Sequence, residues 1–214
     1  MSNIVAIDGP RVAPAFGRTP RSIVILAHGY GSNGEDLISL APYWREALPD
    51  TVFVAPNAPQ PCPGAPGGFQ WWPVWDADRT AGVRSAAPVL DAFIDAELAR
   101  YGLTEDRLAL VGFSQGTMLA LHVAPRRERT LAGVVGYSGM LIDADEAELR
   151  TRPQVLLAHG DADPMVPIAA FHQAQASLTR LGFQVSAHVC RGLGHSIDSS
   201  GVDLGKDFLS RVLR

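Results

Sequence analysis

Cysteine and net charge are both scarce in this sequence. The 214 residues include two cysteines, Cys62 and Cys190, which lie far apart and lack the CxxC or Cys/His spacing of a metal site. We therefore expect neither a metal site nor a disulfide. A net charge of -4 gives no electrostatic reason to bind nucleic acid or an anionic membrane surface. No glycine-rich nucleotide-binding pattern occurs either, so the sequence implies no cofactor.

Long apolar runs are also missing. No stretch reaches the roughly 18 apolar residues of a transmembrane helix, so we expect no membrane span. Residues 1–21 lack the basic start and apolar core of a secretory signal, and a cytoplasmic location is expected. Hydrophobic residues make up 47% and charged residues 19%, which indicates an ordered globule. The length suits one domain over residues 1–214, in which 1–21 form an N-terminal extension.

Buried strands and amphipathic helices alternate along the chain. Strands are expected at residues 22–28, 51–55, 107–111, 131–137, 154–159 and 184–190, with a short edge strand at 3–7. Helices are expected at 35–48 after a Ser32-x-x-Glu35 capping box, at 88–101 with Pro88 in the first turn, and at 115–123, 144–151, 168–181 and 208–213. This alternation predicts an α/β fold, a doubly wound and mostly parallel sheet with helices on both faces.

A long segment over residues 56–82 is dense in proline, glycine and tryptophan. So long a loop in a compact domain is usually functional or disordered, and its large aromatic side chains need a surface to bury against. We expect them to wall a substrate pocket; the alternative is that they only cover the edge of the core. The candidate pocket residues are Phe69, Trp71, Trp72, Trp75 and, from a later loop, Met165.

A Gly-x-Ser-x-Gly motif centred on Ser114 links an apolar run to an apolar segment suited to a helix. In this context the serine is expected on a sharp strand-to-helix turn that lifts its hydroxyl clear of the sheet edge. Gly112 and Gly116 remove the clash that side chains two positions away would cause. Ser138 also follows a strand, but it lacks the second glycine, so we interpret it as a structural turn.

A serine nucleophile needs a base and a group that orients the base. His195 is the expected base, because it lies in a glycine-flanked loop after the last strand; His159, at the end of the strand before, is the alternative. Asp161 and Asp163 follow that same strand. The spacing favours Asp163 as the orienting acid, with Asp161 shaping the turn, and leaves the choice open.

The tetrahedral intermediate needs two donors aimed at its oxyanion. One is expected from the backbone N–H of Gln115, directly after the nucleophile. The other is expected from the backbone N–H of Tyr30, in the loop after the first long strand. All of these loops follow the carboxyl ends of strands, where a parallel sheet binds its ligands.

Four motifs together resemble the phospholipase/carboxylesterase family of α/β-hydrolases. They are His28-Gly29-Tyr30-Gly31, Gly112-Phe113-Ser114-Gln115-Gly116, His159-Gly160-Asp161-Ala162-Asp163-Pro164-Met165-Val166-Pro167 and Gly194-His195. The resemblance covers residue 22 to the end of the chain. The family includes acyl-protein thioesterases and small bacterial carboxylesterases. The resemblance implies an α/β-hydrolase fold, a triad of Ser114, Asp163 and His195, an oxyanion hole from Tyr30 and Gln115, and no cofactor.

The chain departs from the family pattern near the substrate pocket. The family more often has an aliphatic residue at Tyr30 and an acid at Ser32, and Trp72-Pro73-Val74-Trp75-Asp76 matches its Trp-aromatic-Asp segment only loosely. The short segment between the strands that end at Tyr137 and begin at Gln154 leaves no room for a helical lid. An open pocket without a lid domain is therefore expected.

The expected activity is that of a serine hydrolase, in other words a carboxylesterase, acyl thioesterase or lysophospholipase-like enzyme. It would cleave short- to medium-chain esters or thioesters through an acyl-enzyme. The substrate would be a small molecule or an acylated partner, and the protein a monomer or homodimer. One alternative is a dienelactone-hydrolase-like enzyme, although such enzymes carry cysteine where this chain has Ser114. Another is a ligand-binding homologue without turnover, which usually lacks a triad member.

Overall fold

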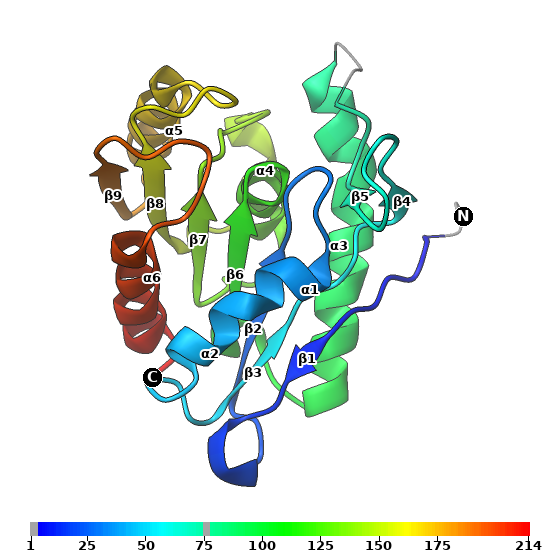
Figure 1. The fold of residues 1–214 in the computed structure, drawn as a ribbon. Helices are drawn as coiled ribbons and strands as arrows, with labels where there is room; N and C mark the ends of the chain where they lie inside the picture. The colour runs from blue at the N-terminus through cyan, green and yellow to red at the C-terminus, as the bar shows by residue number, and fades with distance from the viewer. Residues whose placement is uncertain (1–3, 75–77) are drawn as a thin grey trace.

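The computed structural model describes residues 4–74 and 78–214. Within them, seven strands form one sheet in the order β1-β3-β2-β6-β7-β8-β9 (Figure 1). The strands are β1 (Arg11–Val12), β2 (Ser22–Ala27), β3 (Thr51–Val54), β6 (Leu108–Phe113), β7 (Gly133–Tyr137), β8 (Gln154–Gly160) and β9 (Val185–Cys190). Every neighbouring pair is parallel except β1 with β3. The doubly wound, mostly parallel sheet predicted from the sequence is confirmed.

Helices cover both faces of the sheet (Figure 1). The helices are α1 (Gly34–Leu37), α2 (Ala41–Trp44), α3 (Arg79–Tyr101), α4 (Gln115–Val123), α5 (Ile168–Arg180) and α6 (Ser199–Val212). Alternate side chains of β2 enter different cores: Ile23 and Ile25 belong to the core that α3, α4 and α5 cover, whereas Val24 and Leu26 belong to the core that α1, α2 and α6 cover. Burial on both faces explains the nearly continuous apolar sequence of this strand.

The edge strand lies at Arg11–Val12, and the strand predicted at residues 3–7 is wrong for residues 4–7, while Asn3 lies outside the described residues. The apolar side chains of Ile4 and Val5 that suggested a strand are more than half exposed. The free edge of β3 is instead met further along the chain, where the carbonyl of Pro10 accepts a hydrogen bond from the N–H of Ala55. Residues 8–12 therefore cover that edge.

The helix predicted at 35–48 is divided into α1, a 3-10 turn at Ile38–Leu40 and α2, and the expected capping box is absent. The cap of α1 is Asn33, whose side chain accepts a hydrogen bond from the N–H of Asp36 at 2.9 Å. Ser32 lies one residue before this cap. Its hydroxyl donates to the Asp36 carboxylate, and its carbonyl accepts a hydrogen bond from the N–H of Phe69.

Helix α3 begins at Arg79, so Pro88 lies in its interior. The prediction that Pro88 lies in the first turn was wrong. Asp78 caps the helix by accepting a hydrogen bond from the N–H of Ala81. Because proline in a helix interior removes one backbone hydrogen bond, it is more common in the first turn of a helix. Pro88 therefore suggested a helix start in the wrong place. The predicted end is confirmed, because Gly102 takes a left-handed conformation there.

The segment 138–153 between β7 and β8 contains a 3-10 turn at Glu146–Glu148 where a short helix was expected at 144–151. It carries no helical lid, in agreement with the sequence. Within residues 56–82, here called the Trp-rich segment, β4 (Gln60–Pro61) and β5 (Phe69–Gln70) form a small hairpin that no sequence pattern predicted. No helix among the described residues is both long and apolar enough to span a bilayer.

Candidate active site

Ser114 lies on the sharp turn between β6 and α4. Its backbone has φ 52° and ψ -113°, a conformation that non-glycine residues rarely adopt. A Cβ atom at Gly116 would lie 1.8 Å from the carbonyl oxygen of Ala27 on β2, and one at Gly112 would lie 2.4 Å from the nitrogen of Thr117. Both glycines are therefore required for the close packing of this turn, as the motif predicted.

A buried histidine holds the loop that carries Tyr30. The Nε2 atom of His28 accepts a hydrogen bond from the N–H of Ala58 at 3.0 Å. The proton is therefore on Nδ1, which donates to the carbonyl of Gly29 at 2.8 Å. Burial lowers the pKa of His28, which keeps this ring neutral near pH 7. The N–H of Gly31 donates to the carbonyl of Phe69 and fixes the other end of the loop.

His195 and Asp163 are hydrogen bonded, with 2.7 Å between Nδ1 and Oδ2. Because a carboxylate only accepts hydrogen bonds, the imidazole proton is on Nδ1 and the lone pair is on Nε2. A neutral imidazole in this state can accept a proton from a hydroxyl. The ring also packs against Phe113, with 4.9 Å between the ring centroids.

Asp163 is buried and held by several donors. Its Oδ1 atom accepts hydrogen bonds from the N–H groups of Met165 and Val166 at 2.8 and 2.9 Å. Burial by itself would raise its pKa, but the bonds from His195 and these two N–H groups outweigh it and lower the pKa of Asp163. The carboxylate therefore stays ionised. Asp161 accepts a hydrogen bond from the N–H of Gly192 at 2.6 Å, so it braces the loop before His195.

His159, the alternative base, and Ser138, the alternative nucleophile, both make structural contacts. The Nε2 atom of His159 lies 2.8 Å from the carbonyl of Val166, to which it donates, and its ring is buried. Ser138 is buried, with its hydroxyl 3.2 Å from the carbonyl of Ser196, to which it donates. Both contacts fasten the loops that carry Asp163 and His195.

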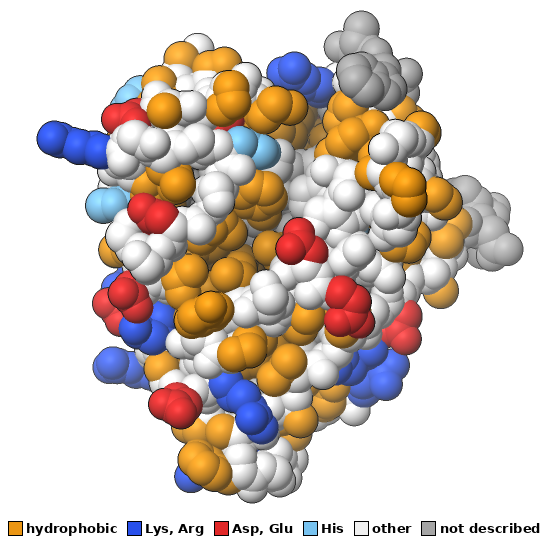
Figure 2. Space-filling view, viewed as in Figure 1, with side chains coloured by type: hydrophobic (Ala, Val, Ile, Leu, Met, Phe, Trp, Pro, Cys, Tyr) orange, Lys and Arg blue, Asp and Glu red, His pale blue; other side chains and the backbone are white. Residues whose placement is uncertain are grey.

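Ser114 and His195 line the same pocket, together with Tyr30 and Gln115. Its volume is about 340 Å³. The apolar part of its wall comes from Trp72, Val74, Met118, Met140, Met165 and Val166. In Figure 2, apolar side chains are spread over the whole face, and some of them lie at the upper end, where the strands of Figure 1 have their carboxyl ends. The pocket therefore combines a polar centre with an apolar wall.

The predicted pocket residues divide into three groups. Trp72 and Met165 line the pocket. Phe69 and Trp71 do not: Trp71 is buried and donates from Nε1 to the carbonyl of His28 at 2.9 Å, while Phe69 pairs through its backbone with the loop of Tyr30. Trp75 lies outside the described residues.

The sequence reasoning missed other pocket residues. Met118 lies four residues after Ser114 on α4, so helical periodicity could have placed it beside the serine. Met140 and Arg79 come from irregular or misassigned segments and gave no such signal.

Comparisons with known proteins identify the family. A family model described as phospholipase/carboxylesterase matches residues 11–213. The chain belongs to this family. The match agrees with the resemblance inferred from the four sequence motifs and extends further toward the N-terminus. This family member therefore has the α/β-hydrolase fold, and it is an esterase-type hydrolase.

Similar proteins carry consistent names. Acyl-protein thioesterase 1 of Neurospora crassa is 27% identical over 226 residues, which cover 95% of this chain and 91% of that protein. The Escherichia coli protein named esterase YpfH is 26% identical over 194 residues, covering 88% and 82%. The crystal structure of esterase PE8 has 42% identity and a TM-score of 0.93, covering 98% of this chain and 100% of that one. The Bacillus cereus carboxylesterase, at 18% identity and a TM-score of 0.80, shares the fold.

The side chain of Gln115 ties the turn of this hydrolase to the Trp-rich segment. Its Oε1 atom accepts a hydrogen bond from the N–H of Trp71 at 2.9 Å, and its Nε2 atom donates to the carbonyl of Trp72 at 2.8 Å. The side chain is almost fully buried. The sequence predicted a role for the backbone of Gln115 only, so the contact made by its side chain is new.

We expect Gln115→Ala to destabilise the hydrolase by about 3 kcal/mol, because two buried backbone groups lose their partner. Urea denaturation measures the difference. Gln173→Ala on the exposed face of α5 is the matched control, with an expected change of about 0.5 kcal/mol or less. Equal stabilities of the two variants would contradict the structural role of the Gln115 side chain.

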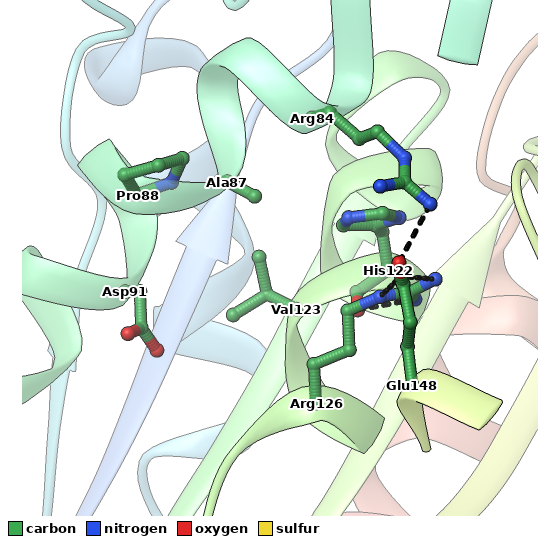
Figure 3. Close-up of a pocket in the computed structure, with 8 residues that line it drawn as sticks. All are labelled: Arg84, Ala87, Pro88, Asp91, His122, Val123, Arg126 and Glu148. Atoms are coloured by element: carbon green, nitrogen blue, oxygen red, sulfur yellow. Dashed lines mark hydrogen bonds and ion pairs between the residues drawn. The ribbon is translucent and has the colours of Figure 1, made fainter. Parts of the chain in front are cut away.

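A second pocket, of about 390 Å³, contains neither Ser114 nor His195 (Figure 3). Arg84 and Arg126 point into it and share the carboxylate of Glu148, at 2.9 Å from each guanidinium. Both arginines also contact Asp143. These ion pairs attach the 138–153 segment to α3 and to the 3-10 turn Ala124–Arg126 that follows α4, so we interpret the pocket as structural.

His122 lies in this second pocket with its side chain buried. Burial and the nearby Arg126 charge lower the pKa of His122 from its usual 6.5 to about 4. The unfolded chain therefore binds more protons than the folded protein between these two values, and the stability falls as the pH falls through this window. We expect the hydrolase to lose about 1–2 kcal/mol from this group between pH 7 and pH 5.

The measurement is urea denaturation at both pH values for the wild type and His122→Gln, which cannot titrate. Between pH 7 and pH 5, the free energy of unfolding of the variant should fall by about 1–2 kcal/mol less than that of the wild type. An equal pH dependence in the two proteins would contradict the assignment.

Proposed function

We propose that the protein cleaves short- to medium-chain carboxylic esters or thioesters through an acyl-enzyme on Ser114. The observation that carries this proposal is the hydrogen bond from His195 to Asp163 at the rim of the pocket that also contains Ser114. It fixes the imidazole in the tautomer that accepts the serine proton.

In the proposed first step, the Oγ atom of Ser114 attacks the acyl carbon while Nε2 of His195 takes its proton. The carbonyl oxygen becomes an oxyanion, and the backbone N–H groups of Tyr30 and Gln115 donate to it. Asp163 stabilises the imidazolium without accepting its proton. The protonated His195 then donates to the leaving alcohol or thiol, and the acyl group remains on the serine.

In the second half of the reaction, water attacks the acyl-enzyme and His195 takes its proton. The tetrahedral intermediate collapses, the proton returns to Ser114, and the free acid leaves. The apolar wall formed by Trp72 and the methionines suits an aliphatic acyl chain. The 138–153 segment places no helical lid over the pocket, which supports a site that is open to substrate.

The names of the relatives support both substrate classes, because they include acyl-protein thioesterases and esterases. The substrate would thus be a small ester, a thioester or an acylated protein. The cytoplasmic location, the single domain over 1–214 and the monomeric or dimeric state stay predictions. No observation favours the hypothesis of a dienelactone-hydrolase-like enzyme, since residue 114 is serine and not cysteine. None favours a binding protein without turnover, since Ser114, Asp163 and His195 are all present.

The test is a burst experiment with activated esters and thioesters of graded chain length. A rapid release of one product equivalent, followed by slower turnover, is expected from an acyl-enzyme. A fluorophosphonate should label Ser114 in the same protein. Binding of the esters without any product release would support the binding protein and contradict our proposal.

A further inference from the structure

Arg79 is the only arginine among the described residues that line the pocket of Ser114 and His195. It is the first residue of α3 and its side chain is exposed. Its Nη1 atom contacts the sulfur of Met140 at 3.6 Å. Among residues 4–74 and 78–214, no carboxylate oxygen lies within 4.0 Å of this guanidinium. The positive charge thus lies in the pocket against an apolar side chain.

The neighbouring arginine on α3 shows the contrast. Arg84 contacts the carboxylates of Asp143 and Glu148 and so attaches the helix to the 138–153 segment. Arg79 makes no such contact in the described residues. A cation in the first turn of a helix is also disfavoured by the helix dipole. The position of Arg79 therefore gives the fold no evident stabilisation.

The position of Arg79 indicates which part of a substrate it meets. Figure 1 shows the start of α3 and the β9–α6 connection, which carries His195, on opposite sides of the β6–α4 turn. In the proposed mechanism, His195 protonates the leaving group, so the leaving group lies on its side of Ser114. The acyl chain extends the other way, toward Met140 and Arg79.

We propose that the preferred acyl groups end in a carboxylate, which Arg79 binds while the methylene chain packs on Met118 and Met140. This inference rests on the proposed function and names its substrate class: half-esters and half-thioesters of dicarboxylic acids. A guanidinium presents two parallel donors to a carboxylate. The apolar methionines next to it reduce the competition from water.

The test compares monoethyl esters of succinic, glutaric, adipic and pimelic acid with ethyl esters of the monocarboxylic acids of equal carbon number. Released ethanol reports all reactions in the same way. At the optimal length, we expect the wild type to favour the half-ester by about tenfold in kcat/KM, mainly through KM. Salt at 0.5 M should reduce this ratio, because it screens the partly exposed pair.

Arg79→Met, which keeps an unbranched apolar side chain, should lower the ratio about tenfold. Arg79→Lys, which keeps the charge, should retain part of it. Arg180→Met, which removes an exposed charge at the end of α5, should retain the wild-type ratio.

A wild type that prefers the neutral ester at every length, or an Arg79→Met variant with an unchanged ratio, would overturn this inference while neutral-ester turnover keeps the proposed function. A wild type that hydrolyses neither series, although it is folded, would overturn the proposed function and this inference with it.

Discussion

Replacing Ser114 with alanine is expected to reduce ester turnover by about 10⁶-fold and to abolish labelling by a fluorophosphonate. The substitution removes the only oxygen that the proposed mechanism acylates. The turn itself should persist, because the N–H of Ser114 donates to the carbonyl of Tyr137, and the N–H of Met118 to the carbonyl of Ser114, without the side chain. Steady-state kinetics and mass spectrometry of the labelled protein measure both effects.

Ser138→Ala is the matched control, since Ser138 is the other serine that follows a strand and has a positive φ of 47°. We expect this variant to be labelled like the wild type, because its hydroxyl is committed to the loop of His195. If labelling survived in Ser114→Ala and disappeared in Ser138→Ala, the nucleophile would be Ser138, and the proposed mechanism would be contradicted.

Asp163→Asn is expected to lower kcat by about 10⁴-fold with little change in fold. The N–H groups of Met165 and Val166 point at Oδ1, so they select the oxygen of the new amide. Its NH₂ group must then face Nδ1 of His195, which has to accept a hydrogen bond. The imidazole proton moves to Nε2, and the ring can no longer take the serine proton.

Asp161→Asn provides the comparison within the same loop. Asp161 serves as an acceptor for the N–H of Gly192, and an amide oxygen can replace the carboxylate there. We expect a change of about tenfold or less in kcat. If Asp161→Asn were the slower of the two variants, the orienting acid would be Asp161, the alternative that the spacing alone had left open.

Much of the fold follows from the sequence because burial on both faces of a parallel sheet leaves long apolar runs. The β2 strand is of this kind, whereas the helix end at Gly102 follows from the left-handed conformation that glycine adopts readily. Local signals failed where tertiary contacts decided the outcome. Ser32 has the form of a cap but pairs with Phe69, and Pro88 has the form of a helix start but lies inside α3.

The candidate site shows the same division. The motifs place Ser114, Asp163 and His195 after the carboxyl ends of strands, and the geometry brings the last two into contact. The wall of the pocket was less accessible to prediction. Trp71 turns away from the pocket and supports His28, because its indole N–H needs a buried acceptor. Arg79 enters the pocket only because α3 begins earlier than its sequence suggests.

The bond between Gln115 and the Trp71–Trp72 backbone has a consequence for laboratory evolution of this enzyme. We expect substitutions that shift the backbone of Trp71 and Trp72 to move Gln115 as well, whose N–H is the proposed oxyanion donor. Libraries that vary the Trp-rich segment alone should therefore trade catalytic rate against substrate range. Varying position 115 in the same library should allow catalytic rate and substrate range to change independently. The backbone N–H of residue 115 would remain, while the side chain that bonds to Trp71 and Trp72 is replaced.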